Sequence, residues 1–105
     1  MKLDTDTAAE ALAALGHPAR LSIFRLLVRA GPDGLRVGDL AAHLDLAPST
    51  LAHHLRALVQ AGLVNQTRHG REVRCDVDFA ATRGLLGFLT EECCTGVRLS
   101  RDAAA

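Results

Sequence analysis

Residues 48–64 constrain the fold of this 105-residue chain most, because they have the pattern of one short amphipathic helix. At about 100° per residue, apolar side chains fall on one side of such a helix and polar side chains on the other. The apolar side chains are Leu51, Leu55, Leu58 and Val59, and the polar ones are Ser49, His53, Arg56 and Gln60. Pro48 suits the first helical position, and Gly62 suits a left-handed residue at the end. The segment is therefore predicted to pack one side against a core and to expose the other.

The polar side of this helix has side chains of the kinds that can read DNA, and the alternative is an ordinary solvent-exposed surface. Hydroxyl, imidazole and guanidinium groups form hydrogen bonds with base edges and phosphates, and free amides in the first turn also attract phosphate. A helix that meets only solvent would be richer in Glu and Lys, and this polar stripe has neither. The side chains predicted to enter a major groove are Ser49, Thr50, His53, His54 and Arg56.

The charge of the chain is concentrated in its middle. The formal net charge is zero, but residues 49–74 contain four arginines and a single acidic residue, Glu72. Residues 1–16 and 75–105 are each acidic by two charges. This distribution, a basic centre between acidic ends, predicts that the middle of the chain contacts phosphate groups.

Further helices are predicted before the amphipathic helix. Thr7-Ala8-Ala9-Glu10 has the form of a capping box, so a first helix should run to about Gly16. His17-Pro18 begins a second, which covers 19–30, is apolar over so much of its surface that it must lie centrally, and stops at Gly31-Pro32. A short helix around 38–44, joined by a few residues to 48–64, completes a helix-turn-helix.

Residues 63–68 and 71–77 alternate in character around His69-Gly70, which predicts a β-hairpin. A hairpin that follows a DNA-reading helix, here the helix predicted at 48–64, is called a wing. Its basic tip, formed by Arg68, His69 and Arg71, is small enough to approach the sugar-phosphate backbone or the minor groove. The alternative interpretation is a turn that meets only solvent.

A last helix from about Phe79 to Glu92 should place Leu85, Leu86, Leu89 and Cys93 on one side and serve as a dimerisation element. Residues 95–105 are predicted to be a flexible tail. The expected fold is a single domain, mainly α with a small β-hairpin: a winged helix-turn-helix with five helices and a two-stranded wing, assembled as a homodimer.

Composition also limits the function classes. No apolar run approaches the ~20 residues of a membrane span, and the acidic N-terminus lacks the features of a signal peptide. The chain is therefore expected to be cytoplasmic, without membrane contact. No nucleophile elbow or acid-base pair is recognisable, so an enzyme is not expected.

Five short motifs together resemble a known family. They are Leu15-Gly16-His17-Pro18-Ala19-Arg20, Val37-Gly38-Asp39-Leu40-Ala41, Ser49-Thr50-Leu51-Ala52-His53-His54-Leu55, Ala61-Gly62-Leu63-Val64 and Gly70-Arg71. Their order and spacing resemble the ArsR/SmtB winged-helix repressors over nearly the whole chain. The resemblance implies a homodimer that binds a palindromic double-stranded operator and leaves it when a metal or metalloid binds.

The chain departs from this family at its usual sensing sites. The positions of the Cys-x-Cys pair are Arg36, Val37 and Gly38, and the Asp and His pattern of other members is not evident between 79 and 92. The thiols present instead are Cys75, Cys93 and Cys94. In a reducing compartment, an odd number of cysteines indicates free thiols or ligands rather than disulfides.

Trivalent arsenic and antimony are thiophilic and three-coordinate, which suits these thiols, whereas structural zinc prefers four ligands. Because the last helix separates Cys75 from the other two by roughly 20 Å, a three-thiol site should form between subunits. Two alternatives remain: an intrachain Cys93-Cys94 pair, which would suit a methylated arsenical, and Cys75 as an ordinary packing residue. For the function as a whole, the alternatives are a Cys93-Cys94 redox switch and a winged-helix protein-interaction module.

Overall fold

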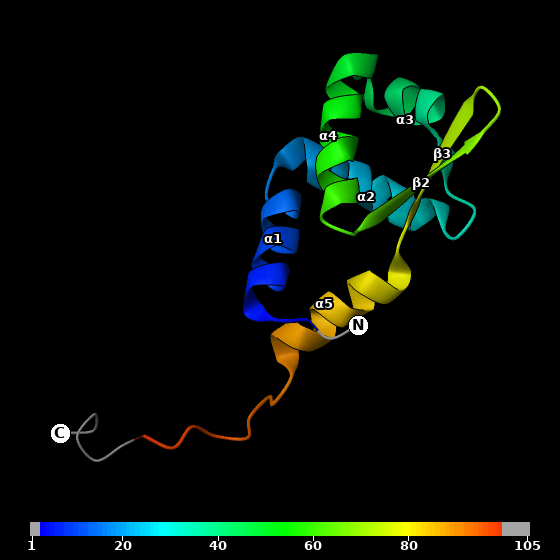
Figure 1. Cartoon of the computed structure of the whole chain (residues 1–105). Helices are drawn as coiled ribbons and strands as arrows, with labels where there is room; N and C mark the ends of the chain where they lie inside the picture. The colour runs from blue at the N-terminus through cyan, green and yellow to red at the C-terminus, as the bar shows by residue number, and fades with distance from the viewer. Residues whose placement is uncertain (1–2, 100–105) are drawn as a thin grey trace.

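The computed structural model describes residues 3–99, which form five helices and a three-stranded antiparallel sheet (Figure 1). In chain order the elements are α1 (Thr5–Leu15), α2 (Pro18–Ala30), β1 (Leu35–Arg36), α3 (Val37–Leu44), α4 (Pro48–Gln60), β2 (Val64–His69), β3 (Glu72–Val77) and α5 (Phe79–Thr90). This arrangement confirms the predicted winged helix-turn-helix. The expected tail at 95–105 falls partly outside the described residues.

The sheet has one strand more than the sequence predicted. Its order is β1-β3-β2, so the wing strands β2 and β3 pair as expected, and β1 adds to the other edge of β3. In this register Leu35 lies opposite Cys75. Gly34 has a φ of 67°, and a Cβ there would collide with the backbone carbonyl of Cys75. The absence of a side chain at Gly34 thus allows the chain to approach β3 closely.

Side chains that accept hydrogen bonds start the first two helices. Asp4, not Thr7, caps α1: its carboxylate accepts a bond of 2.7 Å from the backbone N–H of Thr7. The predicted capping box was therefore wrong, because Thr7 already lies inside the first turn. At α2, Nδ1 of His17 accepts a bond of 3.1 Å from the backbone N–H of Ala19, which confirms the predicted start.

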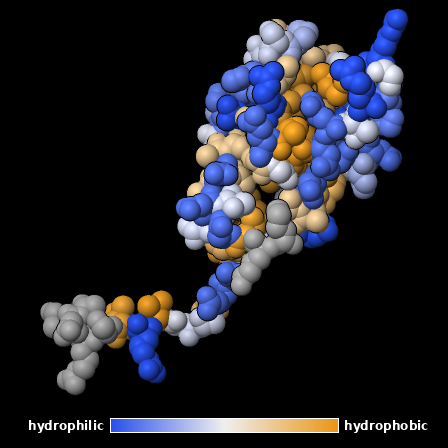
Figure 2. All heavy atoms as spheres, in the orientation of Figure 1, coloured by the Kyte–Doolittle hydropathy of each residue, from blue (hydrophilic) through white to orange (hydrophobic). Residues whose placement is uncertain are grey.

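Helix α2 lies centrally, as predicted. Its side chains Ile23 and Leu27 are fully buried, and it contacts α1, α4 and β3. The core joins side chains from all five helices and from the wing strands. Figure 2 shows mainly hydrophilic residues around an apolar patch on the body of the molecule.

The last helix differs from its predicted form in two ways. Leu85 is buried in the core, whereas Leu86 and Leu89 are 60% and 53% exposed. The prediction of one common side for Leu85, Leu86, Leu89 and Cys93 was therefore wrong, because Leu85 packs within the same subunit. The helix also ends at Thr90, so that Cys93 follows the helix instead of closing it.

No single helix in the described part is long and apolar enough to cross a membrane. Helices α1 and α2 meet the length and composition criteria only when taken together, and they are bent by 96° at their junction.

Candidate nucleic-acid interface

A tight turn sets the angle between α3 and α4. Asp45 ends α3 with a left-handed φ of 52°, a conformation that Asp tolerates better than most residues. The backbone N–H of Leu46 then donates to the carbonyl of Ala41 at 3.0 Å. On the inner side of α4, Leu51, Leu55 and Leu58 are buried, so the helix is fixed by its apolar side.

The outer side of α4 presents the polar stripe that the sequence predicts. Five of its polar side chains belong to exposed residues: Ser49, Thr50, His53, Arg56 and Gln60. Each lies on a helix whose opposite side is packed into the core. These side chains are therefore held on a rigid surface and are accessible to a ligand.

His54 does not belong to this surface, and its predicted contact with DNA was wrong. Only 7% of the residue is exposed. Its Nδ1 accepts a hydrogen bond of 3.3 Å from Nε of Arg20, and its ring lies 4.7 Å from that of His17. Burial lowers the pKa of His54, and the neighbouring His17, Arg20 and His53 lower it further. His54 is a neutral side chain that joins α4 to α2.

The sequence carried a signal for this burial. His54 lies three residues after Leu51 and four before Leu58, and such neighbours share one side of a helix. The structure also brings His17, the N-cap of α2, and Arg20 of α2 against α4 through His54. Neither residue was predicted to lie near the reading helix.

The tip of the wing has the predicted composition and shape. Gly70 adopts a φ of 64° in the two-residue turn between His69 and Glu72, and the side chains of Arg68, His69 and Arg71 belong to exposed residues. Within residues 3–99 the ion pairs shorter than 4 Å are Arg36 with Asp39 and Arg74 with Glu72. The guanidinium groups of Arg56, Arg68 and Arg71 are thus available to an external anion.

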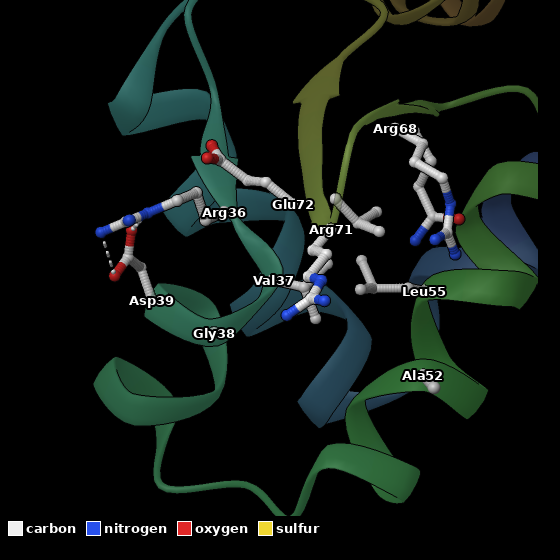
Figure 3. A pocket seen from close by; sticks show the side chains of 11 residues that line it. Arg36, Val37, Gly38, Asp39, Ala52, Leu55, Arg68, Arg71 and Glu72 are labelled. Atoms are coloured by element: carbon white, nitrogen blue, oxygen red, sulfur yellow. Dashed lines mark hydrogen bonds and ion pairs between the residues drawn. The ribbon is translucent and has the colours of Figure 1, made fainter.

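A groove of about 890 Å³ separates the wing from the helix-turn-helix. Figure 3 shows Arg71 extending from the wing towards Val37 and Leu55, which form part of an apolar floor. On the opposite wall, Arg36 is bound to Asp39 at 2.9 Å. The groove combines a basic wing with an apolar floor, and it opens beside α4.

The three cysteines lie in two different environments. Cys75 is fully buried in β3, where Nε2 of Gln66 lies 3.6 Å from its sulfur, and burial raises the pKa of the Cys75 thiol. Cys93 and Cys94 are exposed, and their sulfur atoms are 3.1 Å apart. The hydrogen bond between these sulfurs raises the pKa of Cys93.

Local bonds shape the turn that carries the adjacent thiols. The backbone N–H of Cys93 donates to Thr90 at 3.1 Å, and that of Thr95 donates to Glu92 at 3.2 Å. Glu92 and Cys94 both have positive φ values, 60° and 64°. In the part of the chain that the structure describes, no group of three or more His, Cys, Asp or Glu side chains could hold a metal ion. The burial of Cys75 favours its interpretation as a packing residue.

The chain is similar in sequence to a known family and to a known regulator. The family described as "Helix-turn-helix domain" matches residues 15–67. The HTH-type transcriptional regulator YgaV of Escherichia coli strain K12 is 26% identical over 94 residues, which are 90% of this chain and 93% of that protein.

Two solved structures are similar over most of their length. The ArsR-like transcriptional regulator from Rhodococcus sp. RHA1 is 30% identical with a TM-score of 0.70, covering 80% of this chain and 76% of the other. HlyU from Vibrio cholerae N16961 is 28% identical with a TM-score of 0.70, covering 90% and 99%. The similarity thus extends well beyond the helix-turn-helix.

Proposed function

Because the chain belongs to the ArsR family of winged helix-turn-helix transcriptional regulators, we propose that it is a homodimeric repressor whose operator is released when trivalent arsenic or antimony binds Cys93 and Cys94. DNA binding and transcriptional regulation follow from the family. The proposal concerns the direction of regulation and its inducer. The observation that carries it is the pair of exposed cysteines with sulfur atoms 3.1 Å apart, in the turn that follows α5.

In this proposal, α4 enters the major groove of operator DNA. Ser49, Thr50, His53 and Arg56 contact base edges and nearby phosphates, and Arg68, His69 and Arg71 of the wing contact the backbone. Two copies would bind half-sites about one helical turn apart. The exposed Leu86 and Leu89 of α5, with Leu12 of the neighbouring α1, provide an apolar surface for the second copy.

The chemistry of the thiol pair suits a trivalent arsenical. Arsenite has three hydroxyl groups, and condensation with two thiols forms two As–S bonds and releases two water molecules. Methylarsenite has two hydroxyl groups, so the same two thiols exchange both of them. Soft thiolate ligands favour such centres over magnesium or calcium, and two thiols alone do not satisfy the four-coordinate preference of zinc.

The burial of Cys75 bears on which version of the site is proposed. A three-thiol site between subunits would require Cys75 to leave the core and lose its contact with Gln66. The two-thiol site requires no such movement. We therefore favour the Cys93-Cys94 pair within one chain, with Cys75 as a packing residue.

Release requires that the inducer binds one state of the dimer more tightly than the other. The thiol pair follows α5 directly, and α5 carries the exposed leucines of the proposed dimer interface. A ligand that reshapes this turn could change how the two α5 helices meet and hence the spacing of the two α4 helices. The family resemblance supplies the direction, which is loss of operator affinity.

The test is a gel-shift titration on DNA from upstream of the protein's own gene, with arsenite, methylarsenite, antimonite, zinc and peroxide in parallel. Release by the trivalent arsenicals or antimonite under reducing conditions is expected. Cys93→Ser and Cys94→Ser should each retain DNA binding and lose this release, and Cys75→Ala serves as the matched control that retains both. If Cys75→Ala loses the arsenite response but keeps the methylarsenite response, the three-thiol version is correct.

Mixed dimers locate such a three-thiol site. One subunit carries Cys75→Ser and the other Cys93→Ser/Cys94→Ser. An arrangement between subunits leaves one complete site, and an arrangement within each chain leaves none.

A thiol redox switch is the second candidate, and the same sulfur-sulfur distance favours it. Oxidation by peroxide would join Cys93 and Cys94 in a disulfide, with two protons and two electrons passing to peroxide to form two water molecules. Release by peroxide alone would establish this candidate over the arsenical sensor. Failure to retard any DNA would instead favour a protein-interaction module.

A further inference from the structure

The side of α4 that faces away from the wing has a second group of basic side chains. In Figure 1, α3 and the wing lie on one side of α4, and the corner between α1 and α2 lies on the other. His17, which caps α2, and Arg20 of α2 lie at this corner, and both contact the buried ring of His54. The ring of the exposed His53 lies 5.4 Å from that of His54. His17 and Arg20 thus border the reading surface on the flank opposite the wing.

Both side chains keep hydrogen-bond donors for a ligand. Nδ1 of the exposed His17 accepts the N–H of Ala19, so in the neutral ring the proton is on Nε2. Arg20 uses its Nε for His54, and its terminal nitrogen atoms have no hydrogen-bond partner or ion pair within residues 3–99. The bond to His54 also fixes the position of the guanidinium group.

A helix in the major groove lies between two sugar-phosphate backbones. The wing can contact only the backbone on its own side, so a phosphate of the other strand faces the corner between α1 and α2. We propose that His17 and Arg20 bind a DNA phosphate on the flank opposite the wing. The proposal rests on the proposed function, because it assumes that α4 occupies the major groove.

Glu10 of α1 modifies this site. It lines the same shallow concavity of about 260 Å³ as Arg20 and Gln60, but it forms no ion pair with Arg20 shorter than 4 Å. Its carboxylate would repel a phosphate held there. We therefore expect opposite effects at these two residues of the same concavity: Arg20→Gln weakens DNA binding and Glu10→Gln strengthens it.

The experiment measures the affinity of the protein for DNA by fluorescence anisotropy. Two duplexes are compared, one from upstream of the gene and one of random sequence. Salt is varied between about 50 and 200 mM, because this range resolves the release of counterions. The variants are His17→Asn, which retains a capping side chain, Arg20→Gln and Glu10→Gln. Arg29→Gln is the matched control, and Arg56→Ala tests the proposed function separately. Arg29 is an exposed arginine of the last turn of α2. Melting temperatures verify that each variant is folded.

Arg20→Gln is expected to lower affinity for both duplexes by a similar factor and to reduce the salt slope by about 0.9, the value for one phosphate contact. His17→Asn should weaken both duplexes with less change in slope, and Arg29→Gln should match the wild type. If folded His17→Asn and Arg20→Gln bind both duplexes as the wild type does while Arg56→Ala is impaired, the inference is wrong and the proposed function stands. If the wild type binds neither duplex, both fail together.

Discussion

The C-terminal end of the chain and the half of the molecule that carries α4 are held in different ways. Helix α4 is fixed through the buried Leu51, Leu55 and Leu58, and the polar side chains opposite them are presented on a rigid support. Cys93 and Cys94 instead lie in the turn after α5, which is held by a bond to Thr90 at the end of α5 and by bonds within the turn, where the chain leads away from the body (Figure 1). The polar surface of α4 is therefore complete in one subunit, whereas the thiol end gains further contacts only from a ligand or a second copy.

Helix α5 lies between these two regions and belongs to both. Leu85 packs into the core that supports α4, while Leu86 and Leu89 face outward. We therefore expect the same substitution to lower the stability of the fold at Leu85 but to affect the dimer at Leu86 and Leu89.

Leu85→Asp should have the largest effect, because it places a charge in the core of the subunit. We expect a loss of about 3 to 5 kcal/mol in the free energy of unfolding, measured by urea denaturation. Leu86→Asp and Leu89→Asp should leave the fold intact and instead dissociate the dimer in analytical ultracentrifugation. A stable dimer in both of the latter variants would place the interface elsewhere.

Arg56→Ala and His53→Ala test the rigid region next. Each should weaken operator binding by about 1 to 3 kcal/mol without lowering the melting temperature, because both side chains leave the outer side of α4. His54→Ala is the contrast: it should lower the melting temperature, since its ring is packed against α2. Wild-type affinity in both of the first two variants would show that this surface does not read DNA.

The buried Cys75 and the exposed Cys93 should contribute differently to the stability of the fold. Cys75→Ser should destabilise the fold by about 1 to 2 kcal/mol, because it buries a hydroxyl group in the core. Cys93→Ser should change the free energy of unfolding by less than about 0.5 kcal/mol, as is usual for an exposed side chain. Equal effects in chemical denaturation would contradict the assignment of the two thiols to different environments.

The smallest expected effect is a pH dependence that arises at His54. Because its pKa is lowered in the folded state, the unfolded chain binds more protons once the pH falls below the ordinary histidine value of about 6.5. Stability contributed by neutral His54 is present above that value and is lost as the pH falls towards the folded pKa. His54→Gln should reduce this decline in denaturation measured at pH 7.5 and 5.5, and an unchanged decline would assign it to other groups.

The sequence predicted those parts of the fold that depend on periodicity and on special backbone positions. Leucine spacing located α4, and Gly70 located the turn of the wing. The sequence did not predict β1, because a strand of two residues is too short to show alternation and forms through its approach to β3. The start of α1 was misplaced because Asp4 and Thr7 are both good capping residues and only one can precede the first turn.

The candidate site was predictable where a side chain depends on its own helix. Ser49, His53 and Arg56 are exposed because the opposite side of α4 is apolar. His54 was misassigned although its spacing from Leu51 and Leu58 places it on the apolar side of α4, and its partner Arg20 lies 34 residues earlier in the sequence. The division between Leu85 and Leu86 likewise arises from packing against another element, which the pattern of α5 alone does not contain.

In the proposed mechanism, binding of an arsenical at Cys93 and Cys94 controls the affinity of α4 and the wing for DNA. Its most direct test is operator affinity by fluorescence anisotropy during a methylarsenite titration under reducing, thiol-free conditions, for the wild type and for Cys93→Ser/Cys94→Ser. We expect the wild type to lose at least tenfold in affinity, a coupling of about 1.4 kcal/mol, and the double variant not to respond. Equal release of both proteins, or no release of the wild type, would contradict it.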